Sequence, residues 1–306
     1  MKKIGVIGAG LIGQSWAVVF ARAGYSVNLT DAYPAKLDEA RTNLGARRNG
    51  NGSSREAGLI EFCSTLKEAV AGVDLVQECG PEDVQIKRNI FTDLDQFAPE
   101  GTILASSSSS IVCSLFTEVL PGRHRCLIAH PLNPPHLAPL VELCGAPWTS
   151  PQTIAAAKAI YEDVGQAPIV ITKEIEGFVL NRLQAALLAE ALRLVGDGVV
   201  SAGDLDKTVS EGLGLRWSFL GPFGTIELNA PGGIGDYLQR YGSAFQRITA
   251  TPPPPDVWGP ENIRRVVESW GMRPAPEALA ARSAWRDRRL EALRHHKQSQ
   301  DILVKE

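Results

Sequence analysis

Residues 2–13 read KKIGVIGAGLIG, and this stretch decides the fold that the sequence predicts. It is a short apolar run that ends in three glycines with the spacing G-x-G-x-x-G. A helix-like pattern follows, and its apolar residues fall on one face: Leu11, Ile12, Trp16, Val19 and Phe20. The order strand, glycine turn, helix is the one that binds the pyrophosphate of a dinucleotide.

Each glycine of the motif has its own predicted task. Gly8 allows the tight turn, Gly10 lets a pyrophosphate approach the backbone, and Gly13 lets the helix pack on the strand. The first helical residues, Leu11 and Ile12, contribute unpaired N–H groups at a helix end that carries about half a unit of positive charge. These five residues form the predicted phosphate site.

An acidic residue stands where the motif needs one. A second apolar run, residues 27–30, ends in Asp31, eighteen residues after Gly13. A carboxylate at this position binds the ribose hydroxyls of the adenosine half and repels a 2′-phosphate. No Arg or Lys follows before Lys36, so we expect NAD rather than NADP as the cofactor. A glycine turn and a strand-end Asp with no ligand are the alternative.

Length and composition describe an ordinary soluble chain. A length of 306 residues suits two domains, and a net charge of -3 predicts no attraction to nucleic acid or to an anionic membrane. The five cysteines stand singly, so we expect no disulfide framework and no metal site; reduced cysteines suit a cytoplasmic protein. We also expect neither a membrane span nor a signal peptide, because no long apolar stretch exists and the first strand begins at once.

The pattern of elements predicts an α/β fold, with a Rossmann-type doubly wound, mainly parallel sheet followed by an all-α C-terminal domain. Strand and helix alternate up to about residue 110, which is typical of a parallel sheet with right-handed crossovers. The predicted strands after the first two lie at residues 59–62, 74–78, 102–106, 126–130, 139–144 and 168–172. Helices are predicted at residues 34–48 and 151–164. Together these elements make up an NAD-binding domain, residues 1–173.

The strands stop beyond this point, and residues 174–306 form the predicted helical domain for substrate binding and dimerisation. Residues 178–195 give a long helical pattern that is apolar nearly all round, so deep burial is expected. Further helices are predicted at residues 203–211, 222–242, 257–270 and 276–297. Because apolar helices of this kind usually bury a face against something, we expect a homodimer.

His130 is the histidine best placed for chemistry among the five in the chain. It ends an apolar strand, and the carboxyl ends of strands in an open parallel sheet face the ligand crevice. An imidazole there suits a general base. Glu142, flanked by apolar residues, needs a partner if it is buried, and His130 on an adjoining strand is the obvious one. On the residues alone, a structural ion pair is an equal alternative to a catalytic pair.

Four features together resemble the L-3-hydroxyacyl-CoA dehydrogenase superfamily: ASSSSSI at residues 105–111, HPLNP at 130–134, the acid Glu142, and GFVLNR at 177–182. Within that superfamily the chain most resembles the lambda-crystallin group, which includes L-gulonate 3-dehydrogenase, and the likeness spans nearly the whole chain. The resemblance implies NAD-dependent oxidation of the 3-hydroxyl of a small-molecule 3-hydroxy acid or its CoA thioester.

The resemblance also implies roles for single residues. His130 is similar to the family's catalytic base and Glu142 to the carboxylate that orients it. Ser109 and Asn181 fall at positions that hydrogen-bond the substrate oxygen, although the serine run offers alternative registers for Ser109. Three further matches are implied to lie along the cofactor: Glu82, Lys87 and Ser107. At the position of Ser107, the acyl-CoA enzymes commonly have an asparagine near the nicotinamide.

The favoured reaction is the oxidation of L-gulonate to 3-dehydro-L-gulonate. A sugar acid needs an anion clamp, and Arg216, with Trp217 beside it, offers a bidentate fork for the free carboxylate. An exposed arginine that pairs with a surface acid is an equal alternative for Arg216. A purely structural, crystallin-like role is a different alternative, and the joint presence of His130, Glu142 and Asn181 argues against it.

Two other substrates stay open. A CoA thioester needs a basic arm, for which the chain offers Arg47, Arg48 and Arg55. Carnitine would need an aromatic cage around its trimethylammonium group, and Phe219 and Phe223 lie close to Trp217 in the sequence.

Overall fold

The structure is a computed structural model that describes residues 2–48, 58–271 and 274–300. The chain divides into two compact units, Met1–Arg182 and Leu183–Glu306, called the first and the second unit below. The polar segment around residues 49–57, with Arg55 of the predicted basic arm, lies outside the described residues. The side chains of Arg47 and Arg48 are not among those described either.

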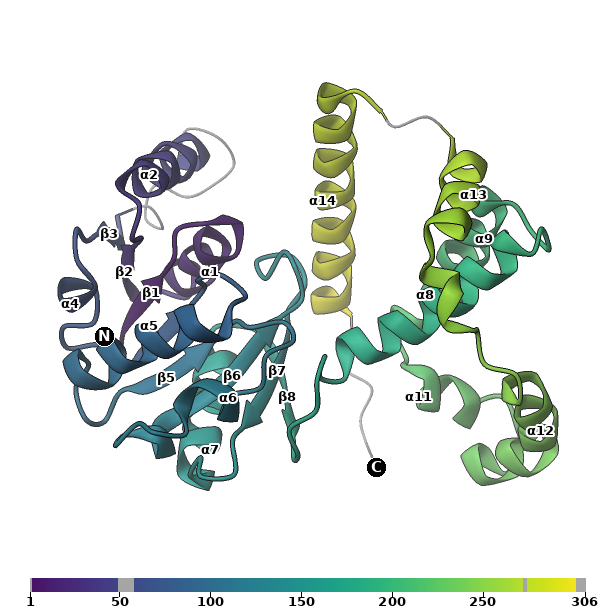
Figure 1. Ribbon diagram of the computed structural model, residues 1–306, viewed down its shortest axis with the longest axis horizontal. Helices are drawn as coiled ribbons and strands as arrows, with labels where there is room; N and C mark the ends of the chain where they lie inside the picture. The colour runs from purple at the N-terminus through teal and green to yellow at the C-terminus, as the bar shows by residue number, and fades with distance from the viewer. Residues whose placement is uncertain (1, 49–57, 272–273, 301–306) are drawn as a thin grey trace. The chain divides into compact units, whose positions relative to one another are not determined.

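The first unit is built on one sheet (Figure 1). Within the described residues this sheet has eight strands in the order β3-β2-β1-β4-β5-β6-β7-β8. The strands are β1 (Lys3–Ile7), β2 (Ser26–Thr30), β3 (Ile60–Phe62), β4 (Leu75–Glu78), β5 (Ile103–Ser106), β6 (Cys126–Pro131), β7 (Leu140–Gly145) and β8 (Ala167–Ile171). All neighbours pair in parallel except β6 and β7, which are antiparallel. The predicted mainly parallel, doubly wound sheet is confirmed.

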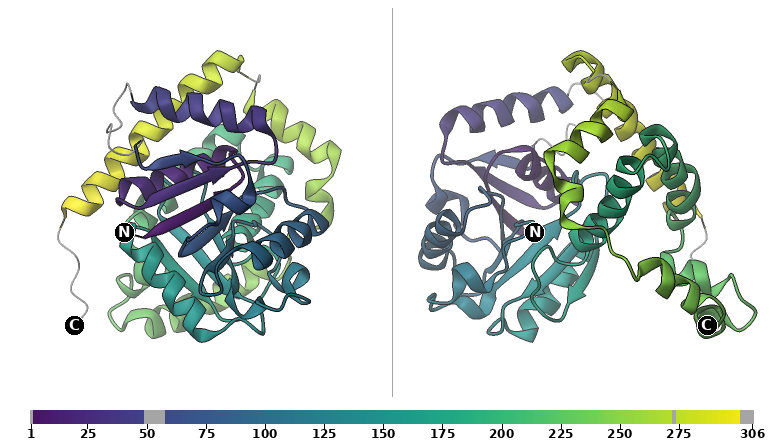
Figure 2. Two further views of the ribbon diagram at one scale, coloured as in Figure 1. Left: turned by 90° about the vertical axis from the view of Figure 1, so that its left-hand side faces the viewer. Right: turned by 45° about the vertical axis from the view of Figure 1, so that its right-hand side comes forward.

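Helices cover both faces of this sheet (Figure 2). Within its described residues the first unit has the helices α1 (Leu11–Arg22), α2 (Pro34–Arg48), α4 (Leu66–Ala69), α5 (Val84–Phe97), α6 (Ser114–Thr117) and α7 (Pro151–Asp163), with a 3-10 turn at Arg123–Arg125. The sheet and helices α1, α2 and α7 enclose one hydrophobic core, which includes Trp16 and Tyr161. The sheet and helices α5 and α6 enclose the other, which includes Phe91 and Phe116. Successive strand residues face opposite cores, as a period of two requires.

The order of the strands positions a ligand crevice. The chain runs outward from β1 to β3 and then starts again from β4 in the opposite direction. At such a switch point the loops after β1 and β4 diverge, and they leave an opening beyond the carboxyl ends of the two strands. The glycine turn follows β1, and the segment from Cys79 to Glu82 follows β4.

One detail of α1 differs from the predicted apolar face. Trp16 and Phe20 are fully buried, whereas Leu11 is 79 % exposed. Leu11 is the first residue of the helix, beyond the carboxyl end of β1, where the core no longer covers it. Leu11 thus belongs to the predicted apolar face by its spacing, but the core does not cover it.

The second unit is helical throughout the residues described. Helix α8 (Leu180–Gly196) enters it, and the remaining helices are α9 (Ala202–Thr208), α10 (Gly214–Trp217), α11 (Pro222–Glu227), α12 (Gly233–Thr249), α13 (Pro260–Trp270) and α14 (Pro276–Ser299). A π-helical stretch at Val209–Leu213 joins α9 to α10, and a 3-10 turn covers Pro255–Trp258. No helix in the described segments combines the length and the apolar character that a membrane crossing needs.

Two predictions for the second unit were wrong. The helix expected at residues 222–242 is two helices, because Pro231 and two glycines interrupt it, the second of which has φ +68°. Helix α8 is not deeply buried in this chain: Leu183, for example, is 63 % exposed. Near the end of α8 the chain does supply cover: Val195 is buried, and Asn262 of α13 donates to the Leu192 carbonyl.

Candidate active site

The glycine turn has a separate steric reason for each glycine. Gly8 has φ +104°, and a Cβ there would lie 2.6 Å from the carbonyl oxygen of Cys79. A Cβ on Gly13 would lie 1.8 Å from the carbonyl oxygen of Gly8, so only glycine lets α1 approach the turn so closely. Both residues are therefore required by the protein itself.

Gly10 is different, because a Cβ there would meet no described atom within 4 Å. The fold does not need a glycine at this exposed position, so the missing side chain leaves room for a ligand. Gly10 is also the N-cap of α1; its helix end has no side-chain cap among the described residues and no acid in its first turn. An open approach to uncapped N–H groups fits the pyrophosphate of a dinucleotide.

Asp31 lies beside this turn. Its carboxylate accepts a hydrogen bond of 2.7 Å from the Ala9 N–H and one of 2.9 Å from the Tyr33 N–H. The carboxylate is thus held at the carboxyl end of β2, next to the glycine turn. Its position fits the ribose hydroxyls of a dinucleotide bound at Gly10.

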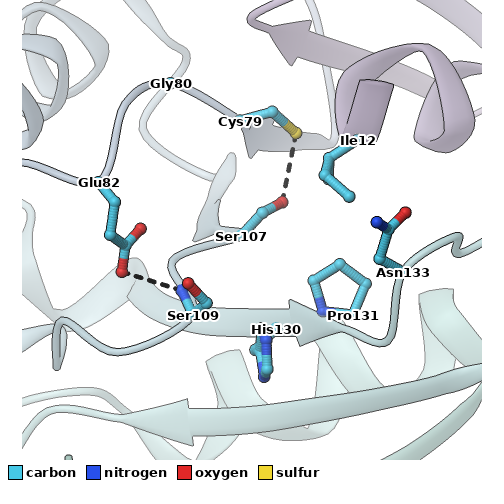
Figure 3. Close-up of a pocket in the computed structure, with 9 residues that line it drawn as sticks. All are labelled: Ile12, Cys79, Gly80, Glu82, Ser107, Ser109, His130, Pro131 and Asn133. Atoms are coloured by element: carbon cyan, nitrogen blue, oxygen red, sulfur yellow. Dashed lines mark hydrogen bonds between the residues drawn. The ribbon is translucent and has the colours of Figure 1, made fainter. Parts of the chain in front are cut away.

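A cavity of about 300 Å³ opens beyond the carboxyl ends of the central strands (Figure 3). It begins at Ile12 of α1, passes the segment after β4, and reaches the end of β6. Its lining residues are Ile12, Cys79, Gly80, Glu82, Ser107, Ser109, His130, Pro131 and Asn133. The structure thus brings five of the predicted site residues to one cavity: Ile12, Glu82, Ser107, Ser109 and His130.

His130 and Glu142 pair directly across β6 and β7. His130 Nδ1 lies 2.8 Å from Glu142 Oε2; Glu142 is fully buried and His130 is 6 % exposed. The other carboxylate oxygen, Oε1, accepts the N–H groups of Val179 and Leu180, each at 2.9 Å. Because a carboxylate only accepts, Nδ1 carries the proton and donates it to Oε2, which leaves Nε2 as the basic nitrogen.

Phe178 supports this pair, and the sequence did not single it out. Its ring centroid lies 5.5 Å from that of His130, and the side chain is fully buried. Its φ of +51° is unusual for a residue with a side chain. Backbone strain of this kind concentrates at functional sites, where the surroundings hold it in place. A strained phenylalanine thus turns the chain so that the next two N–H groups meet Glu142.

Glu82 organises the serine turn after β5. Its Oε1 accepts the N–H groups of Ser109, Ser110 and Ile111 at 2.9–3.2 Å, and also the Ser108 hydroxyl at 2.7 Å. Burial alone would raise the pKa of Glu82, but these hydrogen bonds and the nearby Lys87 outweigh burial and lower the pKa. The carboxylate therefore stays ionised and holds the turn.

Asn181 joins the same turn from the start of α8. Its Nδ2 donates to the Ser109 carbonyl oxygen at 2.7 Å. Ser109 and Asn181 are thus neighbours, and Ser109 also lines the cavity with His130.

Lys87 lies behind the cavity rather than in its wall. It is 1 % exposed, and its ammonium group lies 3.0 Å from a carboxylate oxygen of the fully buried Glu78. Ser106 also donates to Glu78, at 2.5 Å. Glu78 was not predicted as a site residue; the signal was an acid at the end of an apolar strand, as at Asp31. The buried ion pair ties β4, α5 and β5 together under the serine turn.

Arg216 and Trp217, the predicted substrate clamp, lie in the second unit. Both belong to the short helix α10 and are exposed. The residues around the cavity described above all belong to the first unit.

Comparison with known proteins identifies the two domains of the chain. The family model for the NAD-binding domain of 3-hydroxyacyl-CoA dehydrogenase matches residues 3–175, and the model for the C-terminal domain matches residues 177–254. A lambda-crystallin homolog of Bos taurus is 43 % identical over 307 residues, which cover 95 % of each chain. An L-carnitine dehydrogenase of a Pseudomonas species is 32 % identical, covering 94 % of this chain and 91 % of the relative.

Among solved structures, an NAD⁺-dependent 5-formyl-3-hydroxy-2-methylpyridine 4-carboxylic acid 5-dehydrogenase superposes with a TM-score of 0.85. It is 29 % identical, and the match covers 98 % of this chain and all of the other. The glycine turn, the cavity beside it and the two matched domains lead to one conclusion: the chain belongs to the 3-hydroxyacyl-CoA dehydrogenase family of NAD-dependent oxidoreductases.

Proposed function

We propose that the protein oxidises the 3-hydroxyl of an L-3-hydroxy acid, with L-gulonate as substrate and 3-dehydro-L-gulonate as product. The observation that carries this proposal is the buried His130–Glu142 pair, whose imidazole lines the cavity next to the glycine turn. The choice of L-gulonate rests on the resemblance to the lambda-crystallin group, of which a Bos taurus homolog is 43 % identical to this chain.

His130 acts as the general base in this proposal. Its Nε2 takes the hydroxyl proton while the C3–H bond breaks and the C3–O bond becomes a carbonyl. Bound NAD supplies the acceptor for the hydride that leaves C3. Glu142 stabilises the imidazolium that forms, because its carboxylate lies 2.8 Å from Nδ1 and cannot move away from the two backbone N–H groups on its other oxygen.

Ser109 and Asn181 orient the reacting oxygen in this proposal, and Arg216 with Trp217 binds the carboxylate of the sugar acid. Gly8, Gly10, Leu11, Ile12 and Gly13 bind the pyrophosphate, and Asp31 the adenosine ribose. Glu82, in the cavity wall, and Lys87, behind it, hold the serine turn along the cofactor, and Ser107 lies toward the nicotinamide end. A homodimer in a reducing compartment such as the cytoplasm completes the proposal; all five cysteines are free thiols.

L-carnitine is the second candidate substrate, because an L-carnitine dehydrogenase is 32 % identical over most of both chains. A 3-hydroxyacyl-CoA is the third, from the family itself. A panel of L-gulonate, L-carnitine and 3-hydroxybutyryl-CoA, each with NAD, separates the three when NADH formation is followed. We expect the highest kcat/KM with L-gulonate. A higher value with L-carnitine or 3-hydroxybutyryl-CoA would identify that compound as the substrate instead, and the proposed role of His130 would be unchanged.

His130→Ala tests the chemistry itself. We expect turnover to fall on the order of 10²- to 10⁴-fold with NADH affinity unchanged, because only the proton acceptor is lost. His124→Ala is the matched control, since His124 is an exposed histidine outside the cavity. Near-normal turnover in His130→Ala contradicts the proposed mechanism. Absence of turnover with all three substrates in the unmodified protein contradicts the proposed activity.

A further inference from the structure

Gln77, at the third position of β4, is fully buried behind the cavity and makes three side-chain hydrogen bonds. Its Nε2 donates to Ser107 Oγ at 2.7 Å and to the Ala129 carbonyl oxygen at 3.4 Å. Its Oε1 accepts the hydroxyl of Tyr161, on α7. Neither Gln77 nor Tyr161 has a part in the proposed chemistry, although Gln77 bonds directly to Ser107, which lines the cavity.

The orientation of the Gln77 amide is determined twice over. The Ala129 carbonyl can only accept, so the amide atom that faces it must be the nitrogen. The Tyr161 hydroxyl is fully buried among Trp16 and Phe20, and Gln77 Oε1 is the acceptor it reaches. Burial also keeps the pKa of Tyr161 well above its usual range, so the phenol remains a donor.

This orientation decides what Ser107 can do. Its oxygen accepts from Gln77, so the one proton of the hydroxyl is left to donate elsewhere. Within the described parts of the chain, the sulfur of Cys79 lies 3.2 Å away, and a thiol sulfur is a weak acceptor. Ser107 and Cys79 both line the cavity, and Figure 3 shows them side by side, next to Ile12.

We propose that Tyr161 and Gln77 are positioning residues that make Ser107 a hydrogen-bond donor into the cavity, where it selects a ligand carbonyl oxygen. This inference rests on the proposed dehydrogenase function and extends it. Two carbonyl oxygens meet the requirement: the carboxamide oxygen of the nicotinamide and the carbonyl oxygen of the substrate's oxidised form. Ser107 lines the cavity beside Ile12, at the glycine turn, and this place favours the carboxamide.

The test compares the binding of NADH and of ADP-ribose, which lacks the nicotinamide, by calorimetry. Ser107→Ala removes the donor, and Tyr161→Phe releases the amide that orients it. We expect each variant to weaken NADH binding roughly 2- to 10-fold, the contribution of one hydrogen bond, and to leave ADP-ribose binding unchanged. Tyr25→Phe is the matched control, because Tyr25 packs on the same Phe20 but donates to Asp163 outside the cavity.

The outcomes either show which of the two carbonyl oxygens Ser107 binds or contradict the proposal. An unchanged NADH to ADP-ribose ratio with a raised KM for the hydroxy acid assigns the oxygen to the substrate. Wild-type values in Ser107→Ala for both ligands and for KM overturn the proposal, as does a Tyr161→Phe variant that behaves like Tyr25→Phe. Should Tyr161→Phe not fold, Gln77→Glu makes the same test, because a carboxylate has no N–H and accepts the Ser107 proton itself. These binding measurements can be read even if none of the proposed substrates is turned over.

Discussion

Glu142 shows how one residue joins two parts of the candidate site. One carboxylate oxygen accepts from His130, and the other accepts two backbone N–H groups at the start of α8. The buried carboxylate is tolerated here because both of its oxygens accept hydrogen bonds. Such an arrangement fixes the imidazole in the tautomer that carries its proton on Nδ1, whereas the neutral amide of a glutamine would favour the opposite tautomer.

Glu142→Gln tests that claim. The amide oxygen has to stay on the two backbone N–H groups, so the amide NH₂ must face Nδ1 of His130. The imidazole proton then moves to Nε2 and the base is lost. We expect turnover to fall on the order of 10²- to 10⁴-fold, with NADH affinity retained. Glu174→Gln is the control, since Glu174 also accepts a backbone N–H, from Ser114. Equal kinetics in the two variants would contradict the tautomer argument.

At the scale of elements, the glycine turn combines packing and ligand binding in three residues. Gly13→Ala places a Cβ 1.8 Å from a carbonyl oxygen, whereas Gly10→Ala meets no described atom. We expect Gly13→Ala to lower the thermal midpoint or prevent folding, and Gly10→Ala to keep the midpoint while NADH affinity falls at least tenfold. Thermal unfolding and calorimetry measure both. Normal NADH binding by Gly10→Ala would contradict the assignment of the pyrophosphate to this turn.

The serine turn is a second element of the site, and Glu82 accepts several of its N–H groups. Glu82 has a lowered pKa, so its hold on the turn is present above its ordinary value of 4.5 and is lost as the pH falls through the lowered value. At neutral pH, Glu82→Gln replaces charged hydrogen bonds with neutral ones. We expect amide hydrogen exchange at Ser109, Ser110 and Ile111 to become roughly 3- to 10-fold faster. Asp93→Asn, an exposed change on α5, should leave these amides as they are.

At the scale of the whole molecule, one helix of the second unit, α12, exposes an apolar face to solvent. On α12, Leu238, Tyr241, Phe245 and Ile248 recur on one side, and each is between 46 and 65 % exposed. Apolar residues gathered at helical spacing on an uncovered face indicate an interface, and we propose a second copy of this chain as the partner.

Phe245→Glu tests the homodimer. A charge at the centre of this face should convert a dimer into a monomer, measured as a halved mass by light scattering. Ser243→Glu is the control, because Ser243 is exposed on the opposite side of α12. A monomeric wild-type protein, or a dimer that tolerates Phe245→Glu, places the interface elsewhere.

Much of the fold was predictable because its signals are local. The helix α2 spans residues 34–48 as predicted, and the strands agree within about one residue, since apolar runs bounded by Gly, Pro and Asp mark where a strand can begin and end. The pairing of the glycine turn with Asp31 could be predicted from the sequence alone, because β1 and β2 are adjacent strands and both positions lie at their carboxyl ends.

Contacts between distant residues were decided by the tertiary structure alone. The antiparallel register of β6 and β7 sets His130 directly opposite Glu142; a shift of one residue would have sent Glu142 to the other face of the sheet. Gln77 meets Tyr161 across 84 positions of sequence, and no periodicity within β4 or α7 indicates that contact. Residue patterns thus determined which segments form strands, helices and a dinucleotide turn, because those depend on backbone preference and on the period of burial. The directions of the hydrogen bonds around the cavity depend on which donors and acceptors the sheet brings face to face, and only the folded chain determines that.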